Sequence, residues 1–218
     1  MQIIKNIFVG FLISFIGSIP LGYLNIVGFE VFQKFGLHKA IFYLLGVISV
    51  EAIVIYFTLL FAKKLIANIK LLKFIEGFSV LFMFLLAYIF YANAIKNSES
   101  QSDLEKYFAY SPFAIGLILS CFNFIQIPFW TSWNLYLLNG NYIEIAKTRK
   151  YFYVLGTIIG TFFGMLVLIL SLNQVANQTN FFGRYLMKVI IPMVFIGLGI
   201  FQGIKFYKKY FISSNKNI

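Results

Sequence analysis

Two short stretches with a proline and nearby polar side chains lie inside long apolar segments of this 218-residue chain. They contain Pro20, Gly22 and Asn25 in the first case, and Asn123, Gln126 and Pro128 in the second. A proline inside a helix lacks an N–H and clashes with the carbonyl four residues back. We therefore expect breaks that leave the carbonyls of Ile16 and Phe124 unpaired, which a membrane interior tolerates only beside protein or a water-filled cavity. Freed N–H groups suit a carboxylate and freed carbonyls suit an ammonium group or a cation, so these six residues are predicted to bind a solute.

Glu51 lies midway along another apolar segment, about eleven residues from either end. An acid at the centre of a bilayer is costly and is a candidate functional residue. We expect Glu51 to bind the solute and to couple its movement to an ion, either as a cation ligand or as a proton carrier. The structural alternative is a partner for buried hydroxyl groups. No basic residue lies deep in another apolar segment, which argues against an internal ion pair.

Residue counts exclude several other kinds of chemistry. The chain has one cysteine, Cys121, and one histidine, His38, so it has no internal disulfide, C-x-x-C pair or histidine-based metal cluster. His38 is expected to be a solvated residue at a membrane interface. No Ser–His, paired-aspartate or H-E-x-x-H arrangement is present in the apolar segments. We therefore predict no catalytic residues, no metal ligands, no cofactor and no enzymatic activity.

The distribution of charge indicates the elements that position these residues. The chain is 61% hydrophobic and 11% charged, with a mean hydropathy of +0.86. Its charges leave six long apolar segments, each near the roughly 20 residues that span a bilayer core. These predicted spans are residues 6–29, 40–62, 74–95, 112–138, 151–173 and 186–207. The sequence thus predicts an all-α integral membrane protein with six transmembrane helices.

The basic residues indicate how these helices are oriented. With six spans, twelve Lys and Arg residues lie on the face that holds both termini and six lie on the other face. Basic residues are enriched on the cytoplasmic side, so we expect a multi-pass protein of the cytoplasmic membrane with both termini in the cytoplasm. This rule also accounts for the net charge of +11, and nucleic acid is not an expected partner.

The chain is expected to be one membrane domain, residues 1–218, built from two related halves. They are a first three-helix repeat (1–95), a polar linker (96–111), a second three-helix repeat (112–210) and a cytoplasmic tail (211–218). Gly10 and Ser14 in the first span recur as Gly116 and Ser120 in the fourth, each followed by a proline. An odd number of spans per half requires the second half to be inverted, so we predict the 3+3 inverted repeat found in many transporters.

Small and aromatic residues have structural interpretations as well. Gly10, Ser14, Gly156, Gly160 and Gly164 are expected mainly to allow close packing of helices, as small residues do in membranes. The polar residues Ser120, Asn123, Gln126, Trp130 and Asn134 are predicted to share one side of the fourth span. For Trp130 and Trp133 the favoured interpretation is an aromatic belt near the headgroups.

Several motifs resemble those of the lysine exporter family, the LysE/RhtB-type amino-acid exporters. Residues 20–25, Pro-Leu-Gly-Tyr-Leu-Asn, resemble its first-helix Pro-x-Gly-Pro-Gln-Asn motif, with Tyr23 and Leu24 in place of the second proline and the glutamine. Gly46 followed by Glu51 is similar to its glycine-then-acid pattern, in which aspartate is usual. Residues 116–130 resemble its fourth-span segment with Asn and then Pro. The resemblance implies a six-helix amino-acid exporter.

Three functions follow from these observations. The first is a proton-driven secondary exporter of amino acids or similar small solutes, because the chain has no G-x-x-x-x-G-K-[ST] loop for nucleotide. The second is a metal or other cation exporter of the same superfamily, since carboxylates and carbonyls bind hard cations. The third is a non-transporting membrane scaffold, which the short loops disfavour. The expected partners are the solute and the bilayer, and the sequence permits a homodimer without requiring one.

Overall fold

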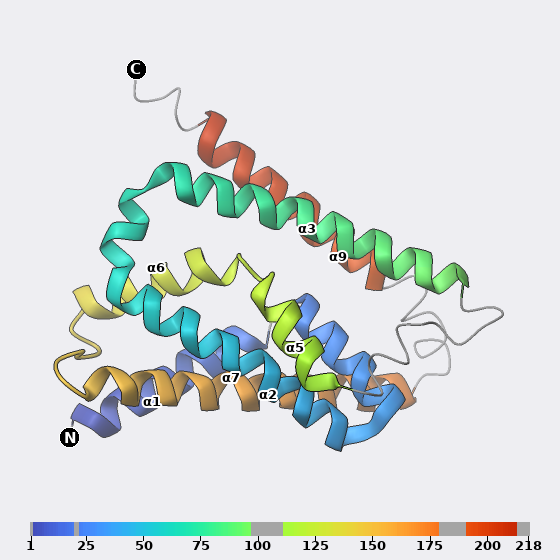
Figure 1. Ribbon diagram of the computed structural model, residues 1–218, viewed down its shortest axis with the longest axis horizontal. Helices are drawn as coiled ribbons and strands as arrows, with labels where there is room; N and C mark the ends of the chain where they lie inside the picture. The colour runs from blue at the N-terminus through green and yellow to red at the C-terminus, as the bar shows by residue number, and fades with distance from the viewer. Residues whose placement is uncertain (1, 20–21, 97–110, 179–190, 213–218) are drawn as a thin grey trace.

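The computed structural model describes residues 2–19, 22–96, 111–178 and 191–212, which form helices and no strand (Figure 1). The helices are α1 (Gln2–Ser18), α2 (Tyr23–Ala67), α3 (Ile69–Lys96), α5 (Pro112–Cys121), α6 (Gln126–Asn139), α7 (Arg149–Gln178), α9 (Ile191–Tyr207) and the short π-helix η2 (Lys208–Ile212). The prediction of an all-α protein is confirmed. Most of the predicted linker, the start of the sixth predicted span and most of the tail lie outside the described residues.

The described helices include segments suited to a membrane. Residues Tyr23–Ala62 of α2 and Arg149–Gln174 of α7 are long and apolar enough to cross one. Helices α5 and α6 are bent by 71° at a short break and provide a third candidate if they count as one span. Helix α1 is apolar but shorter. Within its described part, the chain therefore has the helices of a membrane protein.

The boundary between the first two predicted spans differs from the expectation. Helix α1 ends at Ser18, and the chain becomes helical again at Tyr23. From there α2 continues to Ala67, so residues 30–39, which were expected to connect the first two spans, are helical except for a kink at Gly36. Gly36 has φ 78°, a value that glycine adopts at little cost. A single glycine thus turns the chain between two helical segments without a separate loop.

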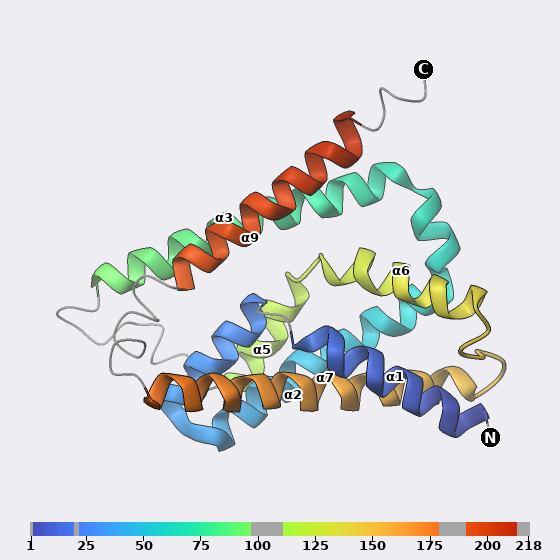
Figure 2. The same cartoon turned by 180° about the vertical axis from the view of Figure 1, so that it is seen from behind.

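Three pairs of helices organise the molecule. Helix α1 packs along α7, α5 packs along α2, and α3 packs along α9. Both α6 and α7 also contact α2, so α2 is central to the main body. The α3–α9 pair diverges from that body over much of its length (Figures 1 and 2). The start of α1 and the helix η2 lie at the same end of the molecule, together with the α2–α3 and α6–α7 connections (Figures 1 and 2).

Glycines bring the backbones of α2 and α5 into direct contact. A Cβ on Gly46 would lie 2.1 Å from the carbonyl oxygen of Phe113, and a Cβ on Gly116 would lie 2.2 Å from that of Tyr43. No side chain fits at either position unless the backbones separate. The two helices therefore meet through a reciprocal glycine contact.

The α1–α7 pair is built in the same way. A Cβ on Gly156 would lie 2.2 Å from the carbonyl oxygen of Ile7, and a Cβ on Gly10 would lie 2.7 Å from that of Tyr153. Gly160 and Gly164 likewise lie against the backbone of α1. The predicted packing role of these glycines is confirmed.

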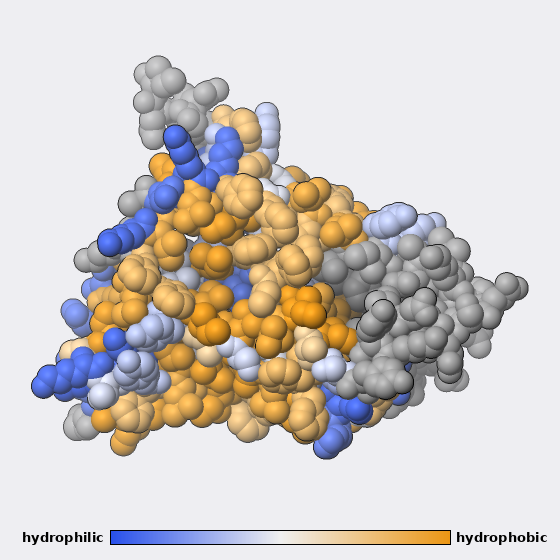
Figure 3. All heavy atoms as spheres, viewed as in Figure 1, coloured by the Kyte–Doolittle hydropathy of each residue, from blue (hydrophilic) through white to orange (hydrophobic). Residues whose placement is uncertain are grey.

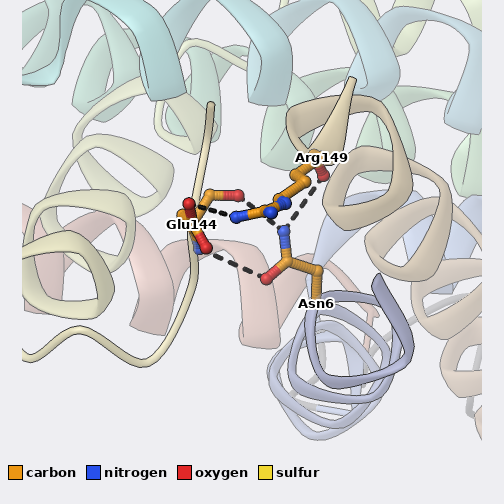
Figure 4. Close-up of polar contacts among 3 residues, drawn as sticks. All are labelled: Asn6, Glu144 and Arg149. Carbon is orange, nitrogen blue, oxygen red and sulfur yellow. Dashed lines mark hydrogen bonds and ion pairs between the residues drawn. The ribbon is translucent and has the colours of Figure 1, made fainter. Parts of the chain in front are cut away.

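A buried asparagine fastens the start of α1 to the α6–α7 connection (Figure 4). The Asn6 side chain is fully buried and donates to the carbonyl oxygens of Glu144, at 2.7 Å, and Arg149, at 3.0 Å. Its own oxygen accepts from the Glu144 backbone N–H at 3.2 Å. An ion pair between the side chains of Arg149 and Glu144 lies over this contact. The loop is thus held to α1 through its backbone.

The surface has the distribution expected of a membrane protein. Figure 3 shows mostly apolar side chains over the middle of one face, while hydrophilic side chains gather at the end where α3 and η2 lie together. Exposed apolar side chains occur on the long helices, among them Ile53, Phe57, Phe163 and Val167. Burial in a bilayer would remove this apolar surface from water.

The glycine contact between α2 and α5 can be tested by adding a single methyl group. Gly46→Ala is expected to lower the free energy of unfolding by about 1–3 kcal/mol or more, because the new Cβ overlaps the backbone of α5. Gly197→Ala is the control, since a Cβ there meets nothing within 4 Å. Thermal unfolding in detergent measures both variants. Equal stability of the two would contradict the described packing.

Candidate functional site

The two helix breaks face a common cavity of about 460 Å³ between the helices, called the central cavity below. One break joins α1 to α2 and the other joins α5 to α6. The polar residues that line the cavity are Ser14, Ser18, Asn25, Glu51, Asn123, Gln126 and Thr161. Apolar and aromatic side chains from α2, α3, α6, α7 and α9 complete the lining, among them Tyr23, Val47, Met83, Phe129, Trp130, Met165, Leu198 and Phe201. Residues far apart in the sequence thus meet at one place.

Most of the predicted solute-binding residues line this cavity. They are Gly22, Asn25, Glu51, Asn123 and Gln126. Pro20 lies outside the described residues. Pro128 lines a second cavity on the other side of α6.

The predicted position of the second break is wrong by a few residues. The chain leaves regular helix between α5 and α6, ahead of Pro128, which lies in the first turn of α6. Proline is tolerated there because first-turn N–H groups have no helical partner. The carbonyl of Phe124 accepts from the Ile127 N–H at 3.1 Å, and that of Ile16 accepts from the Ile19 N–H at 3.3 Å. The expectation that both carbonyls are unpaired is therefore wrong, since short turns satisfy them.

Side-chain amides bridge each break in a similar way. The Asn25 amide donates to the carbonyl oxygen of Ser18, the last residue of α1, at 2.8 Å. The Gln126 amide donates to the carbonyl oxygen of Ser120, next to the end of α5, at 3.1 Å. Both amides are buried and come from the helix that follows the break. Part of their hydrogen-bonding capacity thus stabilises the broken backbone.

Glu51 is held by hydrogen bonds from two other helices. The indole Nε1 of Trp130 in α6 donates to Glu51 Oε1 at 3.1 Å, and the Thr161 hydroxyl in α7 also hydrogen-bonds Glu51. Thr161 further bonds the hydroxyl of Ser14 in α1. A polar chain of four side chains therefore crosses the centre of the bundle and joins α1, α7, α2 and α6.

The aromatic-belt interpretation of Trp130 is wrong. Trp130 is only 2% exposed and its indole N–H pairs with the acid. Trp133, on the same helix, is 37% exposed. The two tryptophans are three positions apart, about 60° around the helix axis, and sequence periodicity does not reveal which of them meets the acid.

Asn134 lies in a separate buried cluster beyond the cavity. It accepts from the Tyr153 hydroxyl at 2.8 Å and donates to the Thr58 hydroxyl at 3.0 Å. The cluster joins α6 to α7 and α2. Gln126, Trp130 and Asn134 are all buried on α6, but Asn134 is not among the residues that line the cavity and has a structural role.

Thr161, Tyr23 and Met83 line the cavity but were not predicted to do so. A signal for Thr161 exists in the sequence, because it follows Gly156 by five residues, as Glu51 follows Gly46. Tyr23 donates through its hydroxyl to the carbonyl oxygen of Leu119 at 2.7 Å, which connects the second half-helix of one break to α5. No pattern in the sequence distinguishes Met83 from the other apolar residues of α3.

A second cavity, of about 1060 Å³, lies between α6 and the α3–α9–η2 arm. The charged residues among its described lining are Lys73, Glu76, Lys205 and Lys209. Glu76 is buried and forms an ion pair with Lys209. Burial opposes the positive charge of Lys209, but the hydrogen bonds and charge interactions with Glu76 and Tyr210 together outweigh this effect and raise the pKa of Lys209 above its ordinary value. Lys209 therefore keeps its charge at neutral pH.

Comparisons of the chain with protein-family models, curated proteins and solved structures give no match. Among the described residues, no group of three or more His, Cys, Asp or Glu side chains could hold a metal ion. The chemistry of the site is therefore judged from its own residues.

The indole–carboxyl contact can be tested by removing its donor. Trp130→Phe is expected to lower the free energy of unfolding by about 1–3 kcal/mol, because Glu51 loses a buried hydrogen-bond donor. Trp133→Phe is the matched control on the exposed side of α6 and is expected to change stability by less than about 0.5 kcal/mol. Denaturant titration in detergent compares the two, and a Trp130→Phe protein as stable as the control would contradict this role.

Proposed function

We propose that the protein is a secondary-active membrane transporter that exports amino acids, or similar small solutes with an ammonium group, in exchange for protons. One observation carries this proposal. A lone acid, Glu51, faces the central cavity at the point where two broken helices meet. Broken helices around a site at membrane depth are typical of secondary transporters, and an intramembrane acid is typical of ion coupling.

The lining of the central cavity suits a small zwitterion with an apolar side chain. Its volume of about 460 Å³ is within the range of small-molecule sites. Glu51 can pair with an ammonium group, while the amide N–H groups of Asn123 can donate to a carboxylate. Apolar walls such as Val47 and Met165 can take the rest of the solute.

The proposal includes six spans arranged as an inverted repeat. In such a repeat the first predicted span corresponds to the fourth, and the fifth corresponds to the second. The α1–α7 pair therefore corresponds to the α5–α2 pair. The α3–α9 pair is exchanged with itself. The contacts support this, because Gly10 and Gly156 meet backbones as Gly116 and Gly46 do, with the same reciprocal pattern. In this repeat Thr161 is the counterpart of Glu51.

The resemblance of residues 20–25 and of Glu51 to the lysine exporter motifs agrees with this function. A divalent-cation exporter is the second hypothesis, and the central cavity favours it less. Glu51 is the only charged residue among its described lining, whereas sites for hard divalent cations usually assemble several oxygen ligands. The liposome assay that tests Glu51→Gln therefore includes divalent metals as well as amino acids.

The proposed orientation can be tested with single cysteines in a Cys121→Ser background. We expect Thr148→Cys, in the α6–α7 connection, to react from the cytoplasmic side, and His38→Cys, beside the α2 kink, to react from outside. Both side chains are exposed at opposite ends of the molecule. Labelling of intact cells and inverted vesicles with an impermeant maleimide separates the sides. Reaction of both positions from one side would contradict six spans with cytoplasmic termini.

The coupling role of Glu51 is tested by Glu51→Gln. This change keeps the side-chain volume and the hydrogen-bonding capacity but removes the exchangeable proton. Purified protein in liposomes is assayed with a panel of radiolabelled amino acids and divalent metals, under an imposed pH gradient. Uphill transport is expected to fall to the level of empty liposomes, while downhill exchange of the same solute continues.

Glu30→Gln is the matched control, because Glu30 is in the same helix but pairs with Lys34 away from the cavity. It is expected to transport as the unaltered protein does. Full pH-driven transport by Glu51→Gln would make the acid structural and would place the coupling elsewhere. Transport of metals alone would favour the second hypothesis.

A further inference from the structure

The central cavity and the second cavity are neighbours. Ile125 and Phe129 line both of them, so these two side chains form the boundary between the cavities. The second cavity is also lined by residues from the start of α3 and from η2, at the end of the molecule where the basic side chains gather (Figure 3). A route from that end to Glu51 therefore passes the side chain of Phe129.

Phe129 occupies a position that depends on a missing side chain. A Cβ on Gly17 of α1 would lie 3.1 Å from the Phe129 Cζ, so the ring lies against the bare backbone of α1. Phe129 is 38% exposed and is not locked into a close-packed core. The Phe129 ring, which closes the passage against Gly17, can therefore open it by a change of rotamer.

Phe129 is also connected to the acid. Its ring contacts that of Trp130 edge to face, with the centroids 5.3 Å apart. Trp130 in turn donates to Glu51. A change at the Glu51 carboxyl group that moves the indole would therefore move Trp130, which contacts Phe129.

The second cavity has a positive lining. Three lysines and one glutamate are its charged residues in the described part of the chain, an excess of two positive charges. Glu76 pairs with Lys209, while the ammonium group of Lys73 lies 4.4 Å from the centre of the Phe211 ring. A cavity with one sign of charge concentrates solutes of the opposite sign. The lining therefore attracts a carboxylate and repels a free cation.

We propose that the second cavity is the cytoplasmic access site of the central cavity, that it binds the carboxylate group of the solute, and that Phe129 is the barrier between the two sites. This inference rests on the proposed function in two respects, that the central cavity holds the solute and that the end of the molecule with η2 faces the cytoplasm. Lys73 and Lys205 attract the carboxylate, and the solute passes Phe129 to reach Glu51.

The charge preference can be tested without knowledge of the solute. In a Cys121→Ser background, Ser132→Cys places a thiol in the second cavity, where Ser132 is exposed. Methanethiosulfonate reagents that carry a sulfonate or a trimethylammonium group are applied to inside-out vesicles. We expect the sulfonate reagent to react at least about tenfold faster, relative to their rates with free thiol. Lys73→Gln with Lys205→Gln is expected to abolish this preference, and Lys39→Gln, remote from the cavity, to leave it unchanged.

The barrier is tested with a thiol at Ser18→Cys, which lines only the central cavity. From the cytoplasmic side this thiol is expected to react slowly, and Phe129→Ala is expected to raise its rate at least about tenfold. Phe129→Leu, which preserves more packing, is expected to give a smaller increase. Phe163→Ala, an exposed position on α7 outside both cavities, is the control and is expected to have no effect.

Equal rates for the two reagents at Ser132→Cys, or a Ser18→Cys rate that neither Phe129 variant changes, would overturn the proposal. Protection of Ser132→Cys by anionic but not neutral phospholipid would assign the cavity to lipid and would also overturn it. These measurements record access and not transport. The access route can therefore stand if the Glu51→Gln assay fails, and it can fail while that assay succeeds.

Discussion

The backbone at the two helix breaks must be hydrogen-bonded inside an apolar body, and much of the structure follows from this constraint. Unpaired backbone groups cost several kcal/mol each in hydrocarbon. Asn25 and Gln126 meet the requirement by donating to the carbonyls of Ser18 and Ser120 across each break. Both breaks need neighbours that exclude lipid, so they lie together around one cavity. The same requirement that makes the breaks tolerable thus creates an internal space.

The polar chain across the centre extends this principle to an acid. Ser14, Thr161, Glu51 and Trp130 come from four helices and are joined by hydrogen bonds. A carboxyl group in an apolar setting requires such partners, whichever protonation state it has. Because each partner belongs to a different helix, a change at the acid acts on the relative positions of these helices.

The α3–α9 arm differs from the rest of the protein in how it is attached. Helices α1, α2, α5 and α7 meet through glycines with their backbones in contact, a geometry that leaves little freedom. The arm contacts the main body mainly through a small apolar cluster that includes Tyr23, Phe82 and Met83. The two cavities lie where the arm and the body separate. The packing is therefore closer within the body, where backbones touch, than between the body and the arm.

The sequence by itself determined the helical class and indicated the membrane character and five of the residues that line the central cavity. Apolar runs and a lone acid within one of them are local features, and their energetic consequences in a bilayer do not depend on the detailed fold. Glycine spacing likewise indicated the packing faces of α1 and α7 before any contact was known. Tertiary structure alone decided that Trp130 meets Glu51 and that Pro128 lies on the far side of α6. The rotation of α6 about its axis depends on the 71° bend at the break, which sequence periodicity cannot predict because regular helical phase is lost there.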